Sequence, residues 1–445
     1  MSDDWGRMSA CDLGREIEDG QIDPVALTEF FLDAVRGHAF RETIYARMTE
    51  DRARAEAKAA RQRAQNGTRA SLLDGVPISW KDLFDTANVA TEAGSRLLAG
   101  RIPRLDAKIV ANAAAAGVVS LGKTHLTELA FSGLGLNPST ETPPNINNPA
   151  LVPGGSSSGA AASTAFGLAA AGIGSDTGGS VRIPAAWNNL VGMKTTHGLV
   201  SLEGVVPLCA RFDTVGPLCR TVEDATHLIG AMTANRPVDL KAARLQGKRF
   251  LVLETLALDE CDDPVMQGFD DAVARLEAGG AHIVRAPLET VNDALDLAGC
   301  LYTVEAYGTW GERIEADPEA MYGPIRERFR AGREFSGADY VRAWQELDRL
   351  RVEYATATAA FDGVLCPTSP ILPPDRDRLV ADDDYFREKN ILGLRNTRIG
   401  NLLGLCALTL PTSQWGAGLM VMGAAGADAA LLRIGAAIEA QLLQI

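Results

Sequence analysis

The chain has 445 residues, 46% of them hydrophobic and 22% charged, which is enough for a large folded core and argues against disorder. Its 57 acidic and 43 basic side chains give a net charge of −14 without any basic run, so nucleic acid and anionic membranes are not expected partners. The seven cysteines show no paired spacing, which favours reduced thiols over a disulfide framework or a metal site.

The N-terminal residues contain neither a basic segment nor an apolar one, so no secretory signal is expected. The low-charge stretches are interrupted by turns, and none supplies the ~20 apolar residues that span a membrane. We therefore expect a soluble cytoplasmic protein that needs no cofactor and acts on a small molecule; a homodimer is left open.

The first part of the chain is expected to be helical. Residues 9–65 place apolar side chains at helical spacing, which predicts a packed N-terminal arm. Asp74 and Gly75 then predict a turn, and residues 76–80 a short strand. Because Lys81 directly follows this apolar strand, its side chain is expected to point inward.

A β and α alternation follows. Residues 106–116 predict a helix, 118–121 a buried strand and 124–131 a second helix. Residues 133–151 form a polar loop with four prolines, and loops of this length inside a domain are usually functional. The loop leads into two runs rich in glycine and serine, 153–159 and 174–184, which are separated by an alanine-rich segment that predicts a buried helix over 160–171.

The second half predicts further alternation around a mainly helical insertion. Helices are expected at 222–232, 264–278 and 428–443, with strands at 249–253, 282–284, 364–367 and 407–411. We expect one α/β domain with a central mixed β-sheet flanked by helices. Its parts would be a helical arm (1–70), a core (71–230), a mostly helical embellishment (231–360) and a return to the core (361–445).

The two glycine and serine runs carry candidate nucleophiles. Ser180 follows Thr177, Gly178 and Gly179 in a turn that could aim several backbone N–H groups at one point and hold an oxyanion. Ser156, 24 residues earlier, lies in a second such turn. The alternative for each serine is a structural role as a helix cap.

Lys81 is the candidate general base. A lysine at an arbitrary position is usually a charged surface residue, but a buried one can act as a base once it is neutral. Its reference pKa of ~10.4 would have to fall by about three units, or roughly 4 kcal/mol, and burial can produce such a shift.

Lys81 and the runs from Gly154 to Gly159 and from Gly174 to Pro184 together resemble the amidase signature family. The resemblance is specific over residues 75–223 and weaker at 339–340, 362–367 and 410–411. It implies a Ser-cisSer-Lys triad in which Ser180 attacks an amide carbonyl, Ser156, in a cis peptide, relays the proton, and neutral Lys81 accepts it. An acyl-enzyme on Ser180 would then be hydrolysed, after ammonia or an amine has left.

The resemblance also implies supporting roles. The backbone amides of Thr177, Gly178 and Gly179, with that of Ser180, would form the oxyanion hole. The side chains of Ser157, Asp176 and Arg182 would support the triad by hydrogen bonding.

Two departures from the family pattern bear on the substrate more than on the reaction. Ser158 stands where the family often has glycine, a small change for a small residue. Residues 414–422 lack the usual segment ending in Gly-Leu-Gln, and related enzymes use that region to line the acyl pocket. Candidate pocket residues are 133–136, Tyr302, Tyr307, Trp310 and Arg328; an arginine in the pocket would indicate an acidic acyl group.

Three other functions fit parts of the sequence. Residues 155–159 match G-x-S-x-G, which would make Ser157 the nucleophile of an α/β-hydrolase esterase with His197, His227 or His282 as its base. A phosphate-binding loop is disfavoured, because no Gly-Lys-Ser/Thr follows the glycines. The family also contains the glutaminase component of tRNA-dependent amidotransferases, which would require partner proteins.

Overall fold

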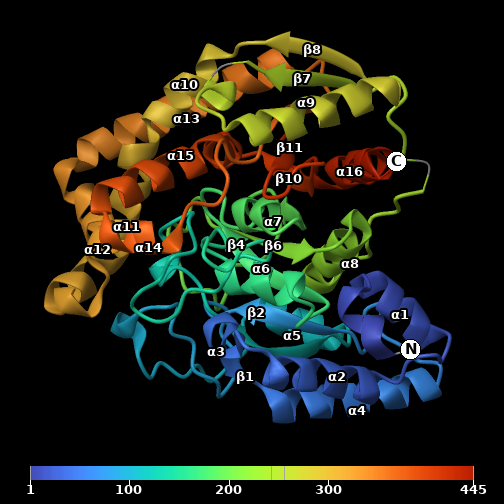
Figure 1. Ribbon diagram of the computed structural model, residues 1–445. Helices are drawn as coiled ribbons and strands as arrows, with labels where there is room; N and C mark the ends of the chain where they lie inside the picture. Colours follow the sequence, from blue (N-terminus) through green and yellow to red (C-terminus); the bar gives the residue numbers. More distant parts are fainter. Residues whose placement is uncertain (1, 242, 255, 444–445) are drawn as a thin grey trace.

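The computed structural model describes residues 2–241, 243–254 and 256–443, and it is organised around one large mixed sheet (Figure 1). The strand order is β1-β3-β2-β4-β6-β5-β10-β11-β9-β7-β8. The described strands are β1 (Tyr45–Met48), β2 (Pro77–Lys81), β3 (Val119–Thr124), β4 (Ala171–Asp176), β5 (Val191–Lys194), β6 (Thr214–Cys219), β7 (Arg249–Leu253), β8 (His282–Ala286), β9 (Gly363–Pro367), β10 (Cys406–Pro411) and β11 (Gly418–Gly423).

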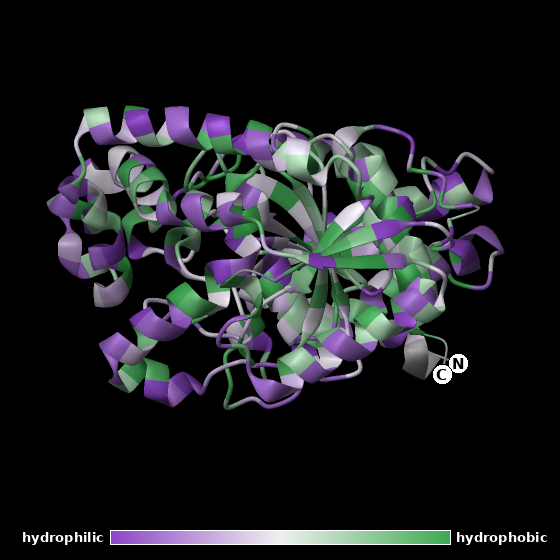
Figure 2. Cartoon of the chain, turned by 90° about the horizontal axis from the view of Figure 1, so that it is seen from above, coloured by the Kyte–Doolittle hydropathy of each residue, from purple (hydrophilic) through white to green (hydrophobic). Residues whose placement is uncertain are grey.

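Helices surround this sheet, as the sequence predicts for the α/β class. Figure 2 shows the strands fanned through the middle of the molecule, with many hydrophilic positions on the surrounding helices. The described α-helices are α1 (Ala10–Glu18), α2 (Pro24–Gly37), α3 (Arg41–Ile44), α4 (Glu50–Gln65), α5 (Lys108–Ala115), α6 (Ser158–Ala165), α7 (Arg182–Trp187), α8 (Val222–Thr233), α9 (Asp263–Ala278), α10 (Glu289–Asp296), α11 (Ala298–Ala316), α12 (Gly323–Arg330), α13 (Gly337–Thr358), α14 (Arg376–Ala381), α15 (Asp383–Leu402) and α16 (Asp428–Leu442). None of these helices, within the described ranges, is both long and apolar enough to cross a membrane.

The core strands are buried on both faces, and this explains why several escaped prediction. Strands β2, β3, β4, β6 and β11 are buried along their whole length, so no polar side chains alternate with apolar ones. Strand β4 also contains two glycines, which weaken any strand signal. Strands β4, β5, β6 and β11 and helix α15 were not predicted.

Three predicted helices differ from the structure. The predicted helical arm is interrupted by β1, a four-residue strand that pairs with β3 and is therefore stabilised by a distant segment. The predicted helix over 160–171 ends at Ala165, because Gly167 adopts a left-handed backbone with φ of 72°. The predicted helix over 124–131 shrinks to a 3-10 turn, Glu128–Ala130. The boundaries assigned to regions within the domain stay predictions.

The sheet brings the two candidate segments to one edge. Strands β2 and β4 are parallel neighbours, with Trp80 paired to Ile173. Their carboxyl ends therefore lie side by side, with Lys81 ending β2 and Ser175 and Asp176 ending β4. Ligand sites of α/β sheets commonly form at such ends.

Candidate active site

Lys81 is fully buried at the end of β2 and points at two hydroxyl groups. Its Nζ donates hydrogen bonds to Ser156 Oγ at 2.7 Å and to Ser175 Oγ at 2.8 Å. The structure thus brings Lys81 and Ser156 together, although 75 residues separate them. Ser175 lies within the predicted glycine and serine run, but no role was predicted for it.

Burial shifts the lysine toward its neutral form. It lowers the pKa of Lys81 to about 7, although the negative charges of Asp176 and Asp213 oppose this shift. A large fraction of Lys81 is therefore a neutral amine just above neutral pH. This is the fall of about three units that a general base at this position requires.

Ser156 lies in a tightly packed turn. The peptide bond between Gly155 and Ser156 is cis, as the resemblance implied. Gly154 has a φ of 78°, and a Cβ there would lie 2.9 Å from the backbone of Pro184, so glycine is required. The Ser156 carbonyl accepts the amide of Thr127 at 3.1 Å, which fixes the turn to the preceding loop.

Ser180 lies in the turn between β4 and α7, and it lines a small cavity. Its carbonyl accepts the amide of Ser157 at 3.2 Å, so the two serine turns lie against each other. Among the described residues, no hydrogen bond joins the hydroxyls of Ser180 and Ser156. Catalytic hydrogen bonds often shorten only when substrate is bound. The transfer of a proton from Ser180 to Ser156 therefore stays a prediction.

The four backbone amides expected to form the oxyanion hole around Ser180 differ in their bonding. The amide of Gly179 already donates to Asp176 Oδ1 at 2.9 Å, so its part in the oxyanion hole stays a prediction. The amides of Thr177, Gly178 and Ser180 have no protein partner within the part of the chain that the structure describes. Thr177 and Gly178 line the cavity together with Ser180, so these three amides are the remaining donors.

Asp176 and Arg182 form a buried, fully bonded ion pair under the turn. Arg182 Nε and Nη2 donate to the two carboxylate oxygens at 3.0 and 2.9 Å. Although burial opposes it, the charge of Arg182 holds the pKa of Asp176 well below its usual range. Asp176 also accepts the amide of Val181 at 3.1 Å, so the pair fixes the backbone on both sides of Ser180.

Helix α15, which was not predicted, completes this support. Asn401 accepts from Arg182 Nη2 at 2.6 Å and donates to Asp176 Oδ1 at 2.9 Å. Thr397 Oγ1 donates to the carbonyl of Gly178 at 2.7 Å. A Cβ on Gly179 would lie 2.1 Å from that hydroxyl, which explains the glycine. In the sequence, the face of α15 that contacts the turn is indicated only by the helical spacing of residues 394, 397, 398 and 401.

The structure argues against Ser157 as a nucleophile. Its hydroxyl is fully buried, does not line the cavity, and donates to the Ser175 carbonyl at 3.2 Å. The three candidate bases are elsewhere: His197 and His282 are exposed, and His227 lies on α8 beside α1. The esterase interpretation is therefore wrong, and the contacts of Ser157 are those of a supporting residue.

The cavity beside Ser180 contains part of the predicted pocket. Tyr302 and Arg328 line it as expected, whereas Tyr307, Trp310 and residues 133–136 do not. The prediction missed Arg398. The full lining is Ala130, Phe131, Ser132, Thr177, Gly178, Ser180, Leu208, Tyr302, Arg328, Leu394 and Arg398.

A larger cavity, of about 460 Å³, lies apart from the nucleophile and is lined by Lys194, Arg211 and Arg351 among others. Ser180 is not part of its wall. Volume therefore does not identify the site; the position of the hydroxyl and lysine groups does.

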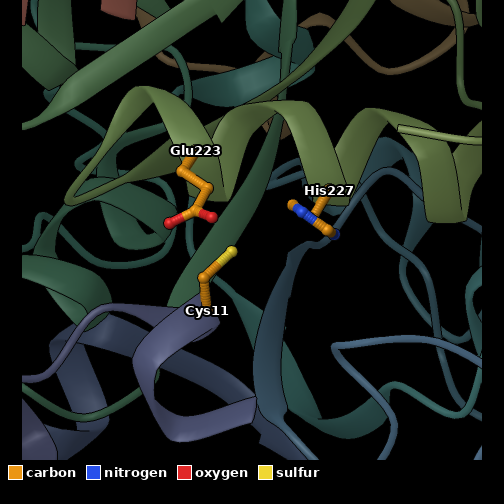
Figure 3. A group of neighbouring side chains, drawn as sticks. All are labelled: Cys11, Glu223 and His227. Atoms are coloured by element: carbon orange, nitrogen blue, oxygen red, sulfur yellow. The ribbon is translucent and has the colours of Figure 1, made fainter. Parts of the chain in front are cut away.

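One group of side chains outside the cavity has the composition of a metal site. Cys11 on α1 faces Glu223 and His227 on α8 (Figure 3), and their ligand atoms all lie within 4.8 Å of one another. The sequence shows no such spacing, because the three residues meet only in the fold. Glu223 is already paired with Arg15, and burial, with Asp224 nearby, raises the pKa of the Cys11 thiol. Both features oppose a cation, so we assign no metal here.

Comparison with known proteins identifies relatives along nearly the whole chain. Residues 26–432 match the family model described as Amidase. A 2-amino-5-chloromuconic acid deaminase of Comamonas testosteroni is 35% identical over 88% of this chain and 87% of its own. One component of the glutamyl-tRNA(Gln) amidotransferase of Natronomonas pharaonis is 33% identical over 82% of this chain and 96% of its own.

Solved structures share the fold. A crystal structure of an amidase superposes with a TM-score of 0.87 at 30% identity, covering 98% of this chain and 100% of that one. The native peptide amidase of Stenotrophomonas maltophilia gives a TM-score of 0.80 at 26% identity, covering 98% and 97%.

Proposed function

Given that the chain belongs to the amidase signature family, whose members hydrolyse amide C–N bonds, we propose that it cleaves linear carboxylic amides, with Ser180 as nucleophile, Ser156 as relay and Lys81 as general base. The observation that carries this proposal is the buried Lys81 with a pKa of about 7, whose Nζ lies 2.7 Å from Ser156 Oγ. A lysine in this state can accept a proton at neutral pH.

In the first half of the reaction, Ser180 Oγ attacks the amide carbon. Its proton passes to Ser156, whose own proton passes to the amine of Lys81. The carbonyl oxygen becomes an oxyanion, and the free amides of Thr177, Gly178 and Ser180 are placed to stabilise it. The C–N bond then breaks, and the leaving nitrogen takes the proton back from Lys81 through Ser156.

In the second half, water replaces the amine. Lys81 again accepts a proton through Ser156 while the water attacks the ester carbon of the acyl-enzyme. The ester bond to Ser180 breaks, Ser180 regains its proton, and a carboxylic acid leaves. The site thus returns to its starting protonation state after each turnover.

The test is an amide panel with ammonia detection, applied to the parent and to Ser180→Ala. We expect Ser180→Ala to lower kcat/KM by roughly 10⁴- to 10⁶-fold, because the acyl-enzyme can no longer form. Ser158→Ala is the matched control: its hydroxyl donates to the His125 carbonyl at 3.4 Å, outside the triad, and activity should be retained. Parental rates in Ser180→Ala would overturn the proposal.

Two relatives point to related alternatives. The name of the Comamonas testosteroni relative is that of a deaminase, so release of ammonia from a C–N bond other than an amide is the broader alternative. The amidotransferase relatives make the glutaminase component of such a complex the second candidate. Purification of the native protein distinguishes this candidate, because a component of a complex would elute with its partners and a stand-alone enzyme would not.

A further inference from the structure

The wall of the Ser180 cavity carries two arginines, from different helices. Arg328 lies on α12 and Arg398 on α15, and both line the cavity that contains Ser180. Arg328 Cζ lies 4.4 Å from the ring centroid of Phe131, and Arg398 Cζ lies 6.0 Å from that of Tyr302. Aromatic rings thus contact both guanidinium groups.

Neither arginine has an acidic partner. Within the described part of the chain, Arg328 and Arg398 form no ion pair and no hydrogen bond. Arg328 Nε is buried without an acceptor, and the hydroxyl of Tyr302, a residue only 4% exposed, is likewise buried without a partner. Buried polar groups are nearly always bonded, so these two unpartnered donors, beside the unpaired guanidinium of Arg398, suit a ligand that carries acceptors.

The two arginines of the cavity affect each other electrostatically. Burial, together with the positive charge of Arg398, lowers the pKa of Arg328 to about 9, and burial also lowers the pKa of Arg398. Arginine side chains keep their charge at neutral pH, so the two guanidinium groups repel each other. An anion between them would relieve the repulsion and satisfy the free donors.

The cavity offers nothing for a positive group. Its described lining contains no aspartate or glutamate, so an ammonium group beside the arginines would be unpaired and repelled. An amino-acid amide, which carries both charges, therefore suits this wall less well than an anion that carries no amine.

We propose that Arg328, Arg398 and Tyr302 form a carboxylate-binding subsite, and that the substrate is the half-amide of a short dicarboxylic acid without an ammonium group. This inference rests on the proposed function, because the acyl group stays bonded to Ser180 while its distal carboxylate reaches the arginines. Because the arginines line the same cavity as Ser180, only a short chain can separate the amide from the distal carboxylate.

The kinetic test compares succinamate with butyramide, a neutral amide of similar length. We expect the parent to favour succinamate in kcat/KM by roughly 10- to 100-fold, the effect of a hydrogen bond to a charged group. In Arg328→Gln and Arg398→Gln this preference should fall toward one, because succinamate loses its carboxylate contact and butyramide has no such contact to lose. Glutamine should be a poorer substrate than succinamate.

Matched controls come from the same two helices. Arg326→Gln on α12 and Arg395→Gln on α15 remove arginines that contact Glu319 and the Asp259 carbonyl, outside the cavity. Both controls should keep the preference for succinamate. Equal loss in a control and in a cavity variant would overturn the subsite.

Binding separates the two proposals. Isothermal titration of succinate into Ser180→Ala should show binding that Arg398→Gln, combined with Ser180→Ala, weakens by roughly 10-fold or more. Succinate binding without hydrolysis of any amide would contradict the proposed function and leave the subsite standing. Hydrolysis of butyramide with no preference for succinamate and no succinate binding would overturn the subsite alone.

Discussion

Three arginines lie around the turn that carries Ser180, and one of them is bonded differently from the other two. Arg182 donates to Asp176, Asn401 and the Thr397 carbonyl, so its guanidinium is satisfied by the protein. Arg328 and Arg398, on the other wall, have no polar partner among the described residues. Arg182 therefore stabilises the turn, whereas Arg328 and Arg398 are available to bind a ligand.

The same contrast applies to the other polar groups of the site. On the side of the turns, the fully buried Lys81 contacts two hydroxyls, and Ser157 both donates to and accepts from Ser175. On the side of the cavity, the Tyr302 hydroxyl is unpartnered. Removing a group from the first side should therefore damage catalysis or folding, whereas removing one from the second should change substrate preference.

Among the variants that test this contrast, the largest effect is expected for Lys81→Arg. Arginine cannot become a neutral base, so kcat/KM should fall by roughly 10²- to 10⁴-fold at pH 8. Lys81→Met, which removes the amine at similar length, should be equally inactive, and circular dichroism of both variants checks the fold. A Lys81→Arg enzyme with the parental rate would exclude this residue as the base.

Next in size is the loss of stability in Arg182→Met. It leaves the buried carboxylate of Asp176 without its counter-ion, which should lower the free energy of unfolding by about 3–5 kcal/mol. Urea denaturation measures this loss. Arg398→Met is the matched comparison from the cavity wall and should be as stable as the parent or more so; equal destabilisation would remove the contrast between the two walls.

A smaller effect concerns pH. Only neutral Lys81 accepts a proton, and its pKa is about 7, so kcat/KM should fall about tenfold for each unit of pH below that value. A profile of kcat/KM against pH, from pH 5 to pH 9, measures this decrease. Arg398→Gln should show the same fall below pH 7, because Arg328, with a pKa of about 9, titrates above that region. A flat profile would contradict the assignment of Lys81.

The smallest effect is expected for Ser175→Ala. Lys81 would keep its contact with Ser156 and lose one hydrogen-bond acceptor, worth about 0.5–1.5 kcal/mol. We expect a decrease of roughly 2- to 10-fold in kcat/KM with KM unchanged, from steady-state kinetics. Inactivation as complete as in Lys81→Met would instead place Ser175 on the path of the proton.

The sequence predicted those parts of the site that lie in compact local motifs. Lys81, Ser156 and Ser180 stand in short runs with fixed spacing, and glycines beside them reveal tight turns. The α/β class followed from alternating elements, but Gly-rich β4 was missed because its residues are buried on both faces. Nothing local to that strand shows which neighbours will bury it.

The remaining part depends on packing between distant segments. Thr397, Arg398 and Asn401 lie in a charged helix whose sequence resembles an ordinary surface helix, yet one face covers the Gly178 turn. Arg328 was named as a candidate, but its lack of a counter-ion is visible only in three dimensions. The contact of the Gly179 amide with Asp176 was not foreseen for the same reason, since it is a detail of backbone orientation.

Strand β10, near the end of the chain, lies between β5 and β11 in the middle of the sheet, and α15 precedes it. A growing chain that has reached residue 380 on the ribosome already contains Lys81, Ser156 and Ser180. It still lacks Thr397 and Asn401, which hold the Ser180 turn, and the strand that completes the centre of the sheet. The supports of the Ser180 turn are therefore complete only after helix α15 and strand β10 have been synthesised.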